Sequence, residues 1–534
     1  MFAGNIILCK LILRRDWLRI LIWFVVMAAL VLGFGSAINE IVGTDESLAN
    51  MTVMMANPAM VAMMGQTYFT ADGVMTIGSI YATMMLVWSA LFMGIMNIFH
   101  VVRHTRADEE RGRIEVIRSL PVGRLSSLSS TMTVAVAMNV IFAVLLGLGL
   151  SVVGTGGMED LGGAMMFGCQ IGVAGLAFAV ITAIFCQICS NPRTAMGFSF
   201  FVLIMMYMIR AAADMQENIV LSIISPLGII QMSKVYVENL LWPALLSLAF
   251  SVVGAGLAFY LCSARDMGAG LVAPKPGKRD AAPYLSSPRG LAWRLLKTPF
   301  IIWAIAIPSL SMSYGSIMGD IETFIESIPA LQEMTGGDPL ILVGFFMVLM
   351  ALMVTIPSIQ FLLKARSQES GGYAEHILAR AASRYDQLSG YFIIALVCGV
   401  LMPFLNSVGF WLACYATMDD PLAFSSILVT CMIYTPAVLF MLGLAMILLA
   451  YLPERTSIVW MYMGYSFAVL YLGALMGLPE WLSYLSPFGL IPQLPADEVT
   501  GASVLLMVIL TVAAATMYVL GFKGYRDRDM KFSH

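Results

Sequence analysis

Charged residues are scarce in this chain of 534 residues: Asp, Glu, Lys and Arg make up 11% of it, whereas a typical soluble domain carries roughly 25%. Hydrophobic residues make up 60%. A soluble core of this size needs far less apolar surface, so the composition excludes an ordinary soluble protein. Because a helix needs roughly 18 or more apolar residues to cross a bilayer, the stretches between successive charged residues become the informative feature.

Several kinds of chemistry lack the residues that they need. No segment matches the Gly-x-x-x-x-Gly-Lys-Ser/Thr loop that cradles ATP phosphates, and no polar segment is long enough to form a nucleotide-binding domain. The four histidines form no metal-ligand pattern, and no nucleophile is paired with a base, which disfavours a membrane enzyme. The cysteines lie mostly within apolar runs, which argues against a disulfide framework and against a redox role for Cys186 and Cys189.

Twelve apolar segments have the length of a membrane-spanning helix. They are 20–39, 73–102, 125–158, 161–192, 194–213, 239–264, 298–319, 339–363, 387–418, 421–453, 456–479 and 499–522. A further charge-free run at 47–71 contains Asn50, Asn57 and Pro58 and has no unbroken apolar core, so we expect an interfacial or re-entrant segment there. The predicted fold class is an all-α polytopic membrane protein with twelve transmembrane helices.

The basic residues are distributed very unevenly between the two sides of this arrangement. With both termini in the cytoplasm, the inner loops hold 27 of the 29 Lys and Arg residues and leave only Arg210 and Lys234 outside. This asymmetry predicts the orientation of a multi-pass protein in the lipid bilayer. The net charge of −3 averages two oppositely charged surfaces, and we expect no nucleic-acid partner.

The second half of the chain repeats the first. A shift of 280 residues pairs the N-terminal region with the region after residue 290, and shifts of 260 to 262 pair the segments that follow. The matched positions include Arg14 with Arg294, Trp23 with Trp303, Glu109 with Glu369, Glu115 with Glu375, Arg193 with Arg455 and Ser225 with Ser486. Four such clusters in chain order at a nearly constant shift indicate an internal duplication.

The repeat predicts the domain organisation. Each half has six spans, an even number, so the halves insert with the same orientation and form two parallel six-helix repeats. We expect a first transmembrane half at 1–264, a polar cytoplasmic linker rich in Pro, Lys and Ser at 265–290, and a second transmembrane half at 291–534.

The loop at 107–124 is the most densely charged stretch of the chain. Ile114, Ile117 and Leu120 recur at spacings of three, which predicts a short amphipathic helix. The basic residues alone would fit a solvated loop, but recurrence of the acidic positions in the second half favours docking onto a two-fold symmetric protein partner. The candidate docking residues are Glu109, Glu110, Gly112, Glu115, Arg118, Arg124, Glu369, Gly372, Glu375 and Arg384, together with Arg193 and Arg455.

The residues before the first span, from Ile6 to Trp17, combine apolar and basic side chains. Lys10, Arg14 and Arg15 alternate with leucines and isoleucines, a basic amphipathic pattern that suits a helix in the inner membrane interface. The alternative is a plain continuation of the first membrane helix. Arg294 is the candidate counterpart of Arg14 in the second half.

Polar residues within the spans have two interpretations each. Arg210 lies four residues before Asp214, near the outer end of the fifth span, where we expect an exposed, snorkelling pair, the alternative being a substrate cavity. Asn97 more often bonds across a helix interface than binds a ligand, although it is also a cavity candidate. The 42 methionines could line an adaptable cavity for large apolar compounds or face lipid.

Two motifs resemble those of a known family. The stretch Glu-Glu-Arg-Gly-Arg-Ile-Glu-Val-Ile-Arg-Ser-Leu-Pro-Val-Gly-Arg at 109–124 resembles the coupling loop of permease subunits of type-2 ABC exporters, and Leu-Ser-Pro-Phe-Gly at 485–489 resembles their outer-loop motif. The nearest resemblance is to the fused two-half permeases that export polyketide antibiotics such as tetronasin. It implies that the loops at 107–124 and 366–384 dock on separate nucleotide-binding subunits, and that residues 6–17 form an elbow helix. The second loop departs from the pattern at Gly371 and at 381–382.

The resemblance implies the permease subunit of an ATP-driven exporter in the bacterial cytoplasmic membrane, not an enzyme. Two copies of a separate ATPase would bind ATP and Mg²⁺, and this chain would hold no cofactor or metal. The expected cargo is an amphiphilic or hydrophobic compound such as an antibiotic. One alternative is an ion-coupled twelve-helix secondary transporter, although its acidic relay residues are missing from the spans. Another is an ABC exporter of a lipid or a cell-wall precursor.

Overall fold

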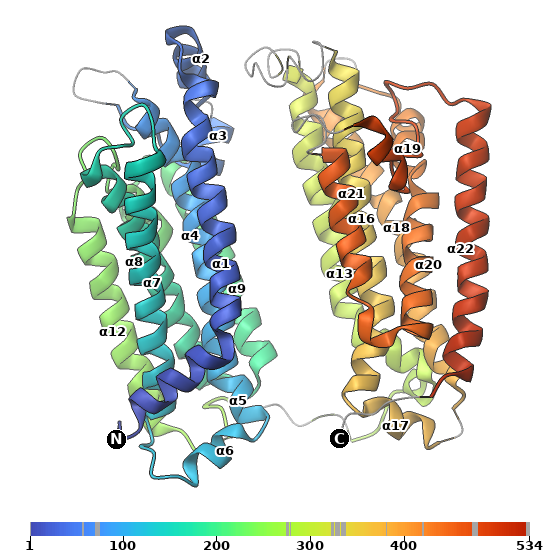
Figure 1. Ribbon diagram of the computed structural model, residues 1–534, viewed down its shortest axis with the longest axis horizontal. Coiled ribbons are helices and arrows are strands. Elements are labelled where there is room, and N and C mark those ends of the chain that lie inside the picture. The colour runs from blue at the N-terminus through green and yellow to red at the C-terminus, as the bar shows by residue number, and fades with distance from the viewer. Residues whose placement is uncertain are drawn as a thin grey trace. The chain divides into compact units, whose positions relative to one another are not determined.

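The computed structural model describes residues 2–55, 58–69, 75–266, 268–273, 277, 279–321, 325, 332, 338–380, 382–418, 421–471 and 479–529. Regular secondary structure in this described part of the chain is entirely helical. The chain divides into two compact units, Met1–Pro276 and Gly277–His534, and the division falls inside the segment at 265–290 (Figure 1).

The first unit is built from long helices connected by short ones. Its helices are α1 (Asn5–Val42), α2 (Asp45–Met55), α3 (Pro58–Met64), α4 (Ile77–His104), α5 (Arg106–Glu110), α6 (Arg113–Arg118), α7 (Ser126–Val153), α8 (Leu161–Ile188), α9 (Pro192–Met215), α10 (Ile219–Ile224), α11 (Pro226–Gln231) and α12 (Trp242–Ala264).

The second unit is likewise built from long helices connected by short ones. Its described helices are η1 (Pro283–Ser286), α13 (Pro288–Gly315), η2 (Ser316–Asp320), α16 (Pro339–Ser370), α17 (Tyr373–Leu378), α18 (Arg384–Thr417), α19 (Phe424–Met432), α20 (Thr435–Tyr451), η3 (Pro453–Arg455), α21 (Ile458–Tyr471), η4 (Glu480–Leu485) and α22 (Gly501–Asp527), where η marks a 3-10 helix.

Within the described residues, eleven helical segments are long and apolar enough to cross a membrane. They coincide with eleven of the twelve predicted spans. The twelfth, at 456–479, begins as α21, and residues 472–478 lie outside the described part of the chain. The prediction of an all-α polytopic membrane protein is therefore confirmed.

The run at 47–71, which the sequence predicts to be interfacial or re-entrant, contains the short helices α2 and α3. They have 11 and 7 residues, too few to cross a bilayer. α3 packs against α4 and α9. Within the described residues of this run, neither helix reaches the length of a span.

Each unit has buried central helices and peripheral ones. In the first unit, α4 and α8 are mostly buried, whereas α1 and α12 expose most of their apolar surface, as lipid-facing helices do. Small residues let α8 approach α7 closely: a Cβ atom at Gly168 would lie 2.1 Å from the carbonyl oxygen of Ala143, and one at Gly172 would lie 3.1 Å from that of Asn139. In the second unit, α16, α18 and α20 take the buried positions.

The Ser-Pro motif forms the same local structure in both units. The Ser225 hydroxyl accepts a hydrogen bond from the backbone N–H of Leu227, and the Ser486 hydroxyl accepts one from Phe488. The glycine that follows is pressed against a backbone carbonyl, because a Cβ atom would lie 2.5 Å from Ser222 O in the first unit and 2.1 Å from Ser483 O in the second. The repeated motif thus closes on its own backbone in both units, as the start of helix α11 in the first and as a turn at 487–490 in the second.

Candidate functional site

The charged loop of each unit lies beyond the end of a buried helix. In the first unit, α5 and α6 follow α4, and in the second, α17 follows α16. Each short helix begins after a glycine in the left-handed region, with φ of 69° at Gly112 and 75° at Gly372. This conformation costs an L side chain about 1–2 kcal/mol, which explains why glycine stands at both positions.

The two loops expose the same positions to solvent. Residues 111–120 and 371–380 have identical patterns of buried, half-buried and exposed side chains. Ile114 and Ala374 are buried and hold each short helix against its unit, while Glu115 and Glu375 are exposed. The predicted short amphipathic helix is therefore present in both halves, although Leu120 is 60% exposed and does not join the buried stripe.

Glu109 is bound by arginines of its own chain. Its carboxylate pairs with Arg106, one turn away, and with Arg265, which follows α12. The Arg265 Nη1 atom lies 3.0 Å from Glu109 Oε2, and its Nε atom donates to Gln187 on α8 at 2.7 Å. Arg124 then donates to the backbone carbonyl of Arg265 at 2.8 Å. These contacts join the charged loop to the ends of α8 and α12.

Glu369 occupies the corresponding place in the second unit and is fully buried. Its carboxylate pairs with Arg528, just after α22, and lies 3.5 Å from Arg366 Nη1. Arg384 donates to the carbonyl oxygens of Arg526 and Arg528 at 2.8 and 2.6 Å. We call these matching arrangements, Glu109 with Arg106 and Arg265 and Glu369 with Arg366 and Arg528, the glutamate clamps.

The remaining docking candidates are divided between the surface and internal contacts. Glu110, Glu115, Arg193 and Glu375 are exposed. Arg118 donates to the backbone carbonyl of Arg124 at 3.0 Å and stabilises the turn after α6. Arg455 lines a depression of about 710 Å³ at the base of the second unit, beside the clamp residues Arg366 and Arg528.

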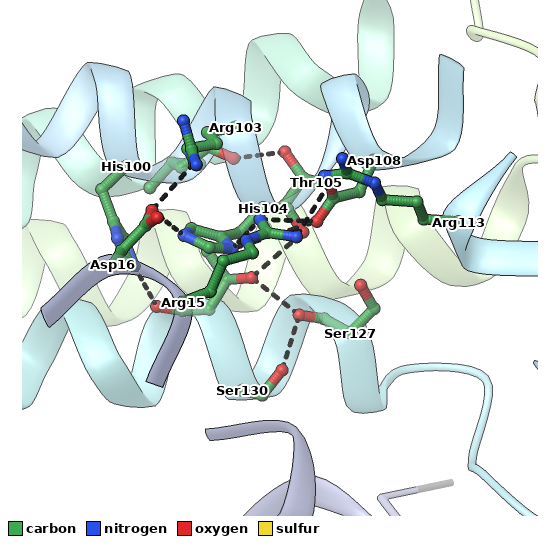
Figure 2. A network of polar contacts seen from close by, with 12 residues as sticks. Arg15, Asp16, His100, Arg103, His104, Thr105, Asp108, Arg113, Ser127 and Ser130 are labelled. Carbon is green, nitrogen blue, oxygen red and sulfur yellow. Dashed lines mark hydrogen bonds and ion pairs between the residues drawn. The ribbon is translucent and has the colours of Figure 1, made fainter. Parts of the chain in front are cut away.

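A buried polar network links α1 to the charged loop in the first unit (Figure 2). Arg15 makes a two-pronged ion pair with Asp108, with N–O distances of 2.9 and 3.2 Å. Asp16 lies 2.9 Å from Arg103 Nε and 2.8 Å from Nε2 of His104. The Asp16 and Asp108 side chains are at most 7% exposed, so both carboxylates depend on these cations.

His104 is the centre of this network, and its partners define its tautomer. The Arg15 guanidinium lies 2.6 Å from Nδ1 and can only donate, so Nδ1 accepts. The ring proton is therefore on Nε2, where it donates to Asp16. A neutral imidazole in this tautomer satisfies both neighbours at once, which makes His104 a bridge between an arginine and a carboxylate.

The second unit has no equivalent of this network at the matched positions. Leu295 and Leu296 stand where the first unit has Arg15 and Asp16, and their side chains have the same half-buried and buried classes. Gln368 takes the place of Asp108. The two units thus share the glutamate clamp, but at these positions the first unit has ion pairs between its first helix and the loop, whereas Leu296 packs in the apolar core of the second unit.

The helix that leads into the charged loop, α4 in the first unit and α16 in the second, also differs in its continuity. In the first unit it is interrupted at Thr105, whose φ and ψ of −116° and −89° separate α4 from α5. The Thr105 hydroxyl donates to the carbonyl of Val101 at 2.5 Å, a local bond that competes with regular helix geometry. The second unit has Ala365 at this position, and α16 continues without a break to Ser370.

The N-terminal segment belongs to one continuous helix, α1. Figure 1 shows this helix changing direction, so that its first part runs obliquely across the base of the unit. Lys10 and Arg14 are exposed on this oblique part, whereas Arg15 faces the network. Arg294, the counterpart of Arg14 on α13, is exposed as well. The structure thus combines the two interpretations: helical continuity with the first span, and an oblique segment that carries the basic residues.

The expectation of an exposed Arg210 is corrected, because its side chain is fully buried. It pairs with Asp214 at 3.1 Å, and its Nη2 atom donates to the carbonyl oxygens of Ala62 and Met63 at 2.9 and 3.1 Å. These carbonyls end α3 and have no partner within that helix. Tyr207 donates to Met63 as well, at 2.9 Å. Arg210 therefore caps α3 and holds it against α9.

Asn97 is part of a buried amide pair between two helices. Its Nδ2 atom donates to Asn139 Oδ1 at 3.2 Å, and Asn139 Nδ2 donates back at 2.9 Å, from α7 to α4. Both side chains are buried. The structure thus places Asn97 at a helix interface, and its amide group is used in that contact.

Cys186 and Cys189 are free thiols and are buried. Burial raises the pKa of Cys189, which keeps its thiol protonated and unreactive near neutral pH. Across the described ranges, no group of three or more His, Cys, Asp or Glu residues has the geometry to hold a metal ion. The polar chemistry of the described chain is concentrated in the two loop regions and in the network beside α1.

Sequence reasoning missed Asp16, His104, Arg265 and Arg528 as parts of this site. The clamp arginines Arg265 and Arg528 did have a signal in the sequence. Each follows the last span of its half, and the number of residues between the glutamate and the arginine differs by only three between the halves. Asp16 had a weaker one, because an acidic residue in the first half stands where the second half has Leu296, whereas His104 had none, since its counterpart is the polar residue Lys364.

Comparison with known proteins identifies the family. The model of the family described as "Multidrug efflux system permease Rv1217c, C-terminal domain" matches residues 9–260 and residues 285–526. The multidrug efflux system permease protein Rv1217c of Mycobacterium tuberculosis (strain ATCC 25618 / H37Rv) is 29% identical over 552 residues, which cover 99% of this chain and 96% of that protein. The chain belongs to this permease family, and it is a membrane subunit of a transporter.

Proposed function

We propose that this chain is the permease of an ATP-driven multidrug efflux system of the ABC type, in which separate subunits hydrolyse ATP. Two copies of an ATPase, each binding ATP with Mg²⁺, would dock on the charged loops at 107–124 and 366–384. The chain would cross the bacterial cytoplasmic membrane with both termini and both loops on the cytoplasmic side, as the distribution of 27 of its 29 basic residues supports.

The observation that carries this proposal is the repetition of one loop architecture in both units. A solvated loop has no need of the same left-handed glycine, the same buried contact and the same exposed glutamate in both copies. Two copies of one partner need all three, because a shared docking surface must present the same side chains twice. The clamps at Glu109 and Glu369 add rigidity, which a loop that transmits force requires.

The structure suggests a division of roles among the acidic residues. Glu109 and Glu369 are positioning residues, because their carboxylates are bound by arginines of this chain. Glu115 and Glu375 are exposed and are the candidates for contact with the ATPase. Val116, beside Glu115, is 70% exposed and supplies an apolar surface of the kind found at the centre of interfaces.

The cargo class rests on the relative's name and on the composition of the chain. An amphiphilic or hydrophobic compound, such as a polyketide antibiotic of the tetronasin type, suits a permease that resembles the exporters of such antibiotics. The 42 methionines supply flexible, polarisable side chains that adapt to large apolar ligands.

The proposal is tested by reconstituting the permease with the ATPase that copurifies with it. The double variant Glu115→Arg and Glu375→Arg reverses the charge of both exposed docking residues without touching a clamp. We expect it to abolish drug-stimulated ATPase activity and ATP-dependent drug transport, while the thermal stability of the permease stays unchanged. Full activity in this variant would contradict the docking assignment.

A second experiment separates ATP-driven from ion-driven transport. Proteoliposomes that contain the permease alone, with a proton or sodium gradient and no ATP, should accumulate no drug. Accumulation under these conditions would establish a secondary transporter. Drug transport that needs both the ATPase and hydrolysable ATP supports the proposal. If lipid or cell-wall precursors, and not drugs, stimulate the ATPase activity, the cargo is one of these precursors.

A further inference from the structure

A cavity of about 540 Å³ opens at the base of the first unit, beside the polar network of Figure 2. It lies among α1, α4, α7, the charged loop and the start of α9. One part of its lining is apolar and comes from Ile20, Trp23, Met96, Phe99, Met138 and Met196. Its location is the level at which the helices leave the membrane on the side that we assign to the cytoplasm.

The other part of the lining is basic. Arg19, Arg103, Arg111 and Arg193 contribute four guanidinium groups, against the two carboxylates of Asp16 and Glu110. Asp16 is already shared among Arg103, Arg19 and His104. Arg111 and Arg193 make no ion pair or side-chain hydrogen bond with any described residue, and the lining as a whole holds two more guanidinium groups than carboxylates.

The basic lining is specific to the first unit. At the matched positions of the second unit, Pro299 replaces Arg19, Leu363 replaces Arg103 and Gly371 replaces Arg111; only Arg193 has a basic counterpart, Arg455. The loops, clamps and exposed glutamates recur in both units. Three of the four arginines thus have no basic counterpart in the second unit, so docking two identical partners does not require them.

We propose that this cavity binds one anionic phospholipid of the inner leaflet. The phosphate would lie among Arg19, Arg111 and Arg193, because guanidinium groups form paired, charge-assisted hydrogen bonds to phosphate oxygens. The acyl chains would cover Trp23 and Phe99. A basic pocket between membrane helices on the cytoplasmic side is the arrangement that suits such headgroups.

The apolar lining distinguishes a lipid from a free anion. A soluble phosphate could use the arginines but would leave Ile20, Trp23 and Met196 in contact with water. A zwitterionic lipid could cover these side chains but would bring its own cation toward four arginines. Only an amphiphile with net negative charge satisfies both parts of the lining, and phospholipid is the one that the surrounding leaflet supplies.

Trp23 makes the site observable in the purified, full-length permease. Phosphatidylglycerol with brominated acyl chains quenches the fluorescence of a nearby tryptophan, and the Trp23→Phe variant identifies its share among the nine tryptophans. We expect Trp23 to be quenched at a much lower fraction of brominated phosphatidylglycerol than of brominated phosphatidylcholine. The double variant Arg111→Gln and Arg193→Gln should weaken this binding by about fivefold per arginine.

Controls and second variants keep the test decisive. Arg455→Gln, at the matched position of the second unit, should leave the Trp23 signal unchanged. Arg19→Gln, which changes an exposed residue on α1, should weaken binding and serves as the test if the double variant fails to fold. Equal quenching by the two lipids, an unaltered signal in the arginine variants, or full competition by millimolar glycerol phosphate would each overturn the proposal. Preferential quenching that disappears with the arginines supports it.

Discussion

Replacing Glu109 by Gln tests whether the glutamate clamp holds the charged loop in place. The glutamine keeps the shape of the side chain but leaves Arg106 and Arg265 without a carboxylate. These two arginines are 1% and 6% exposed, and Glu109 itself is 13% exposed, so the charges cannot simply be taken up by water. Breaking a buried ion pair by removing one partner costs about 3–5 kcal/mol.

The lower end of that range applies here because the clamp lies at the water interface. A loss of about 3 kcal/mol raises the equilibrium for local opening of the loop roughly a hundredfold, since every 1.4 kcal/mol is a factor of ten. The clamp ties α5 to the ends of α8 and α12, so the opening should be confined to residues 106–118. Global unfolding by heat should change less.

Hydrogen–deuterium exchange of the purified permease measures this opening directly. In Glu109→Gln, backbone amides of α5 and α6 should exchange roughly a hundred times faster, while α17 of the second unit is unchanged. Glu369→Gln should produce the reverse pattern. Glu115→Gln, which alters an exposed side chain, serves as the control and should alter neither. If Glu109→Gln abolished ATPase stimulation while exchange stayed within threefold of wild type, Glu109 would contact the partner directly and the positioning role would be refuted.

Four further substitutions test other parts of the structure. Asp108→Asn removes the counter-charge of two arginines and should cost about 2 kcal/mol, seen as faster exchange of the oblique N-terminal part of α1; unchanged exchange there would contradict the link between α1 and the loop. Gly112→Ala and Gly372→Ala should each cost about 1–2 kcal/mol because φ is positive, with faster exchange in the following helix of the same unit only. Arg210→Met leaves Asp214 and the Ala62 carbonyl without their partner and should lower the thermal unfolding temperature of the detergent-solubilised protein by several degrees; an unaltered midpoint would show that Arg210 is not needed to hold α3.

The spans could be predicted because charge-free length alone decides whether a helix crosses a bilayer. The same rule explains why the run at 47–71 was not expected to span, since its polar residues leave no unbroken apolar core. The short amphipathic helix of the first half was also predictable, because Ile114 and Ile117 lie at helical spacing, although Leu120 proved to be exposed.

Arg210 and Glu109 show where sequence reasoning ends. Local spacing indicated the pair of Arg210 and Asp214. The burial of the Arg210 side chain, however, depends on α3, which is distant in sequence and whose terminal carbonyls accept hydrogen bonds from Arg210. Glu109 looked like a surface residue within a charged loop. Its partner Arg265 lies 156 residues away, and no local pattern shows that the two meet. Contacts between distant charges require the three-dimensional fold.

The first helix carries ionic residues at positions 15 and 16 in the first half and leucines at the matched positions in the second half. This difference affects how each half can change during evolution. Arg15, Asp16, His104 and Asp108 satisfy one another, and the leucines at 295 and 296 satisfy their own neighbours by packing. Exchanging Arg15 alone leaves the buried Asp108 carboxylate with Arg113 only, and exchanging Asp108 alone leaves both arginines without this carboxylate. The two solutions are therefore separated by unfavourable intermediates, and the first half is committed to its ionic form. Among homologous permeases, residues at positions 15, 16, 104 and 108 should vary together as one block, and independent variation at these four positions would contradict this coupling.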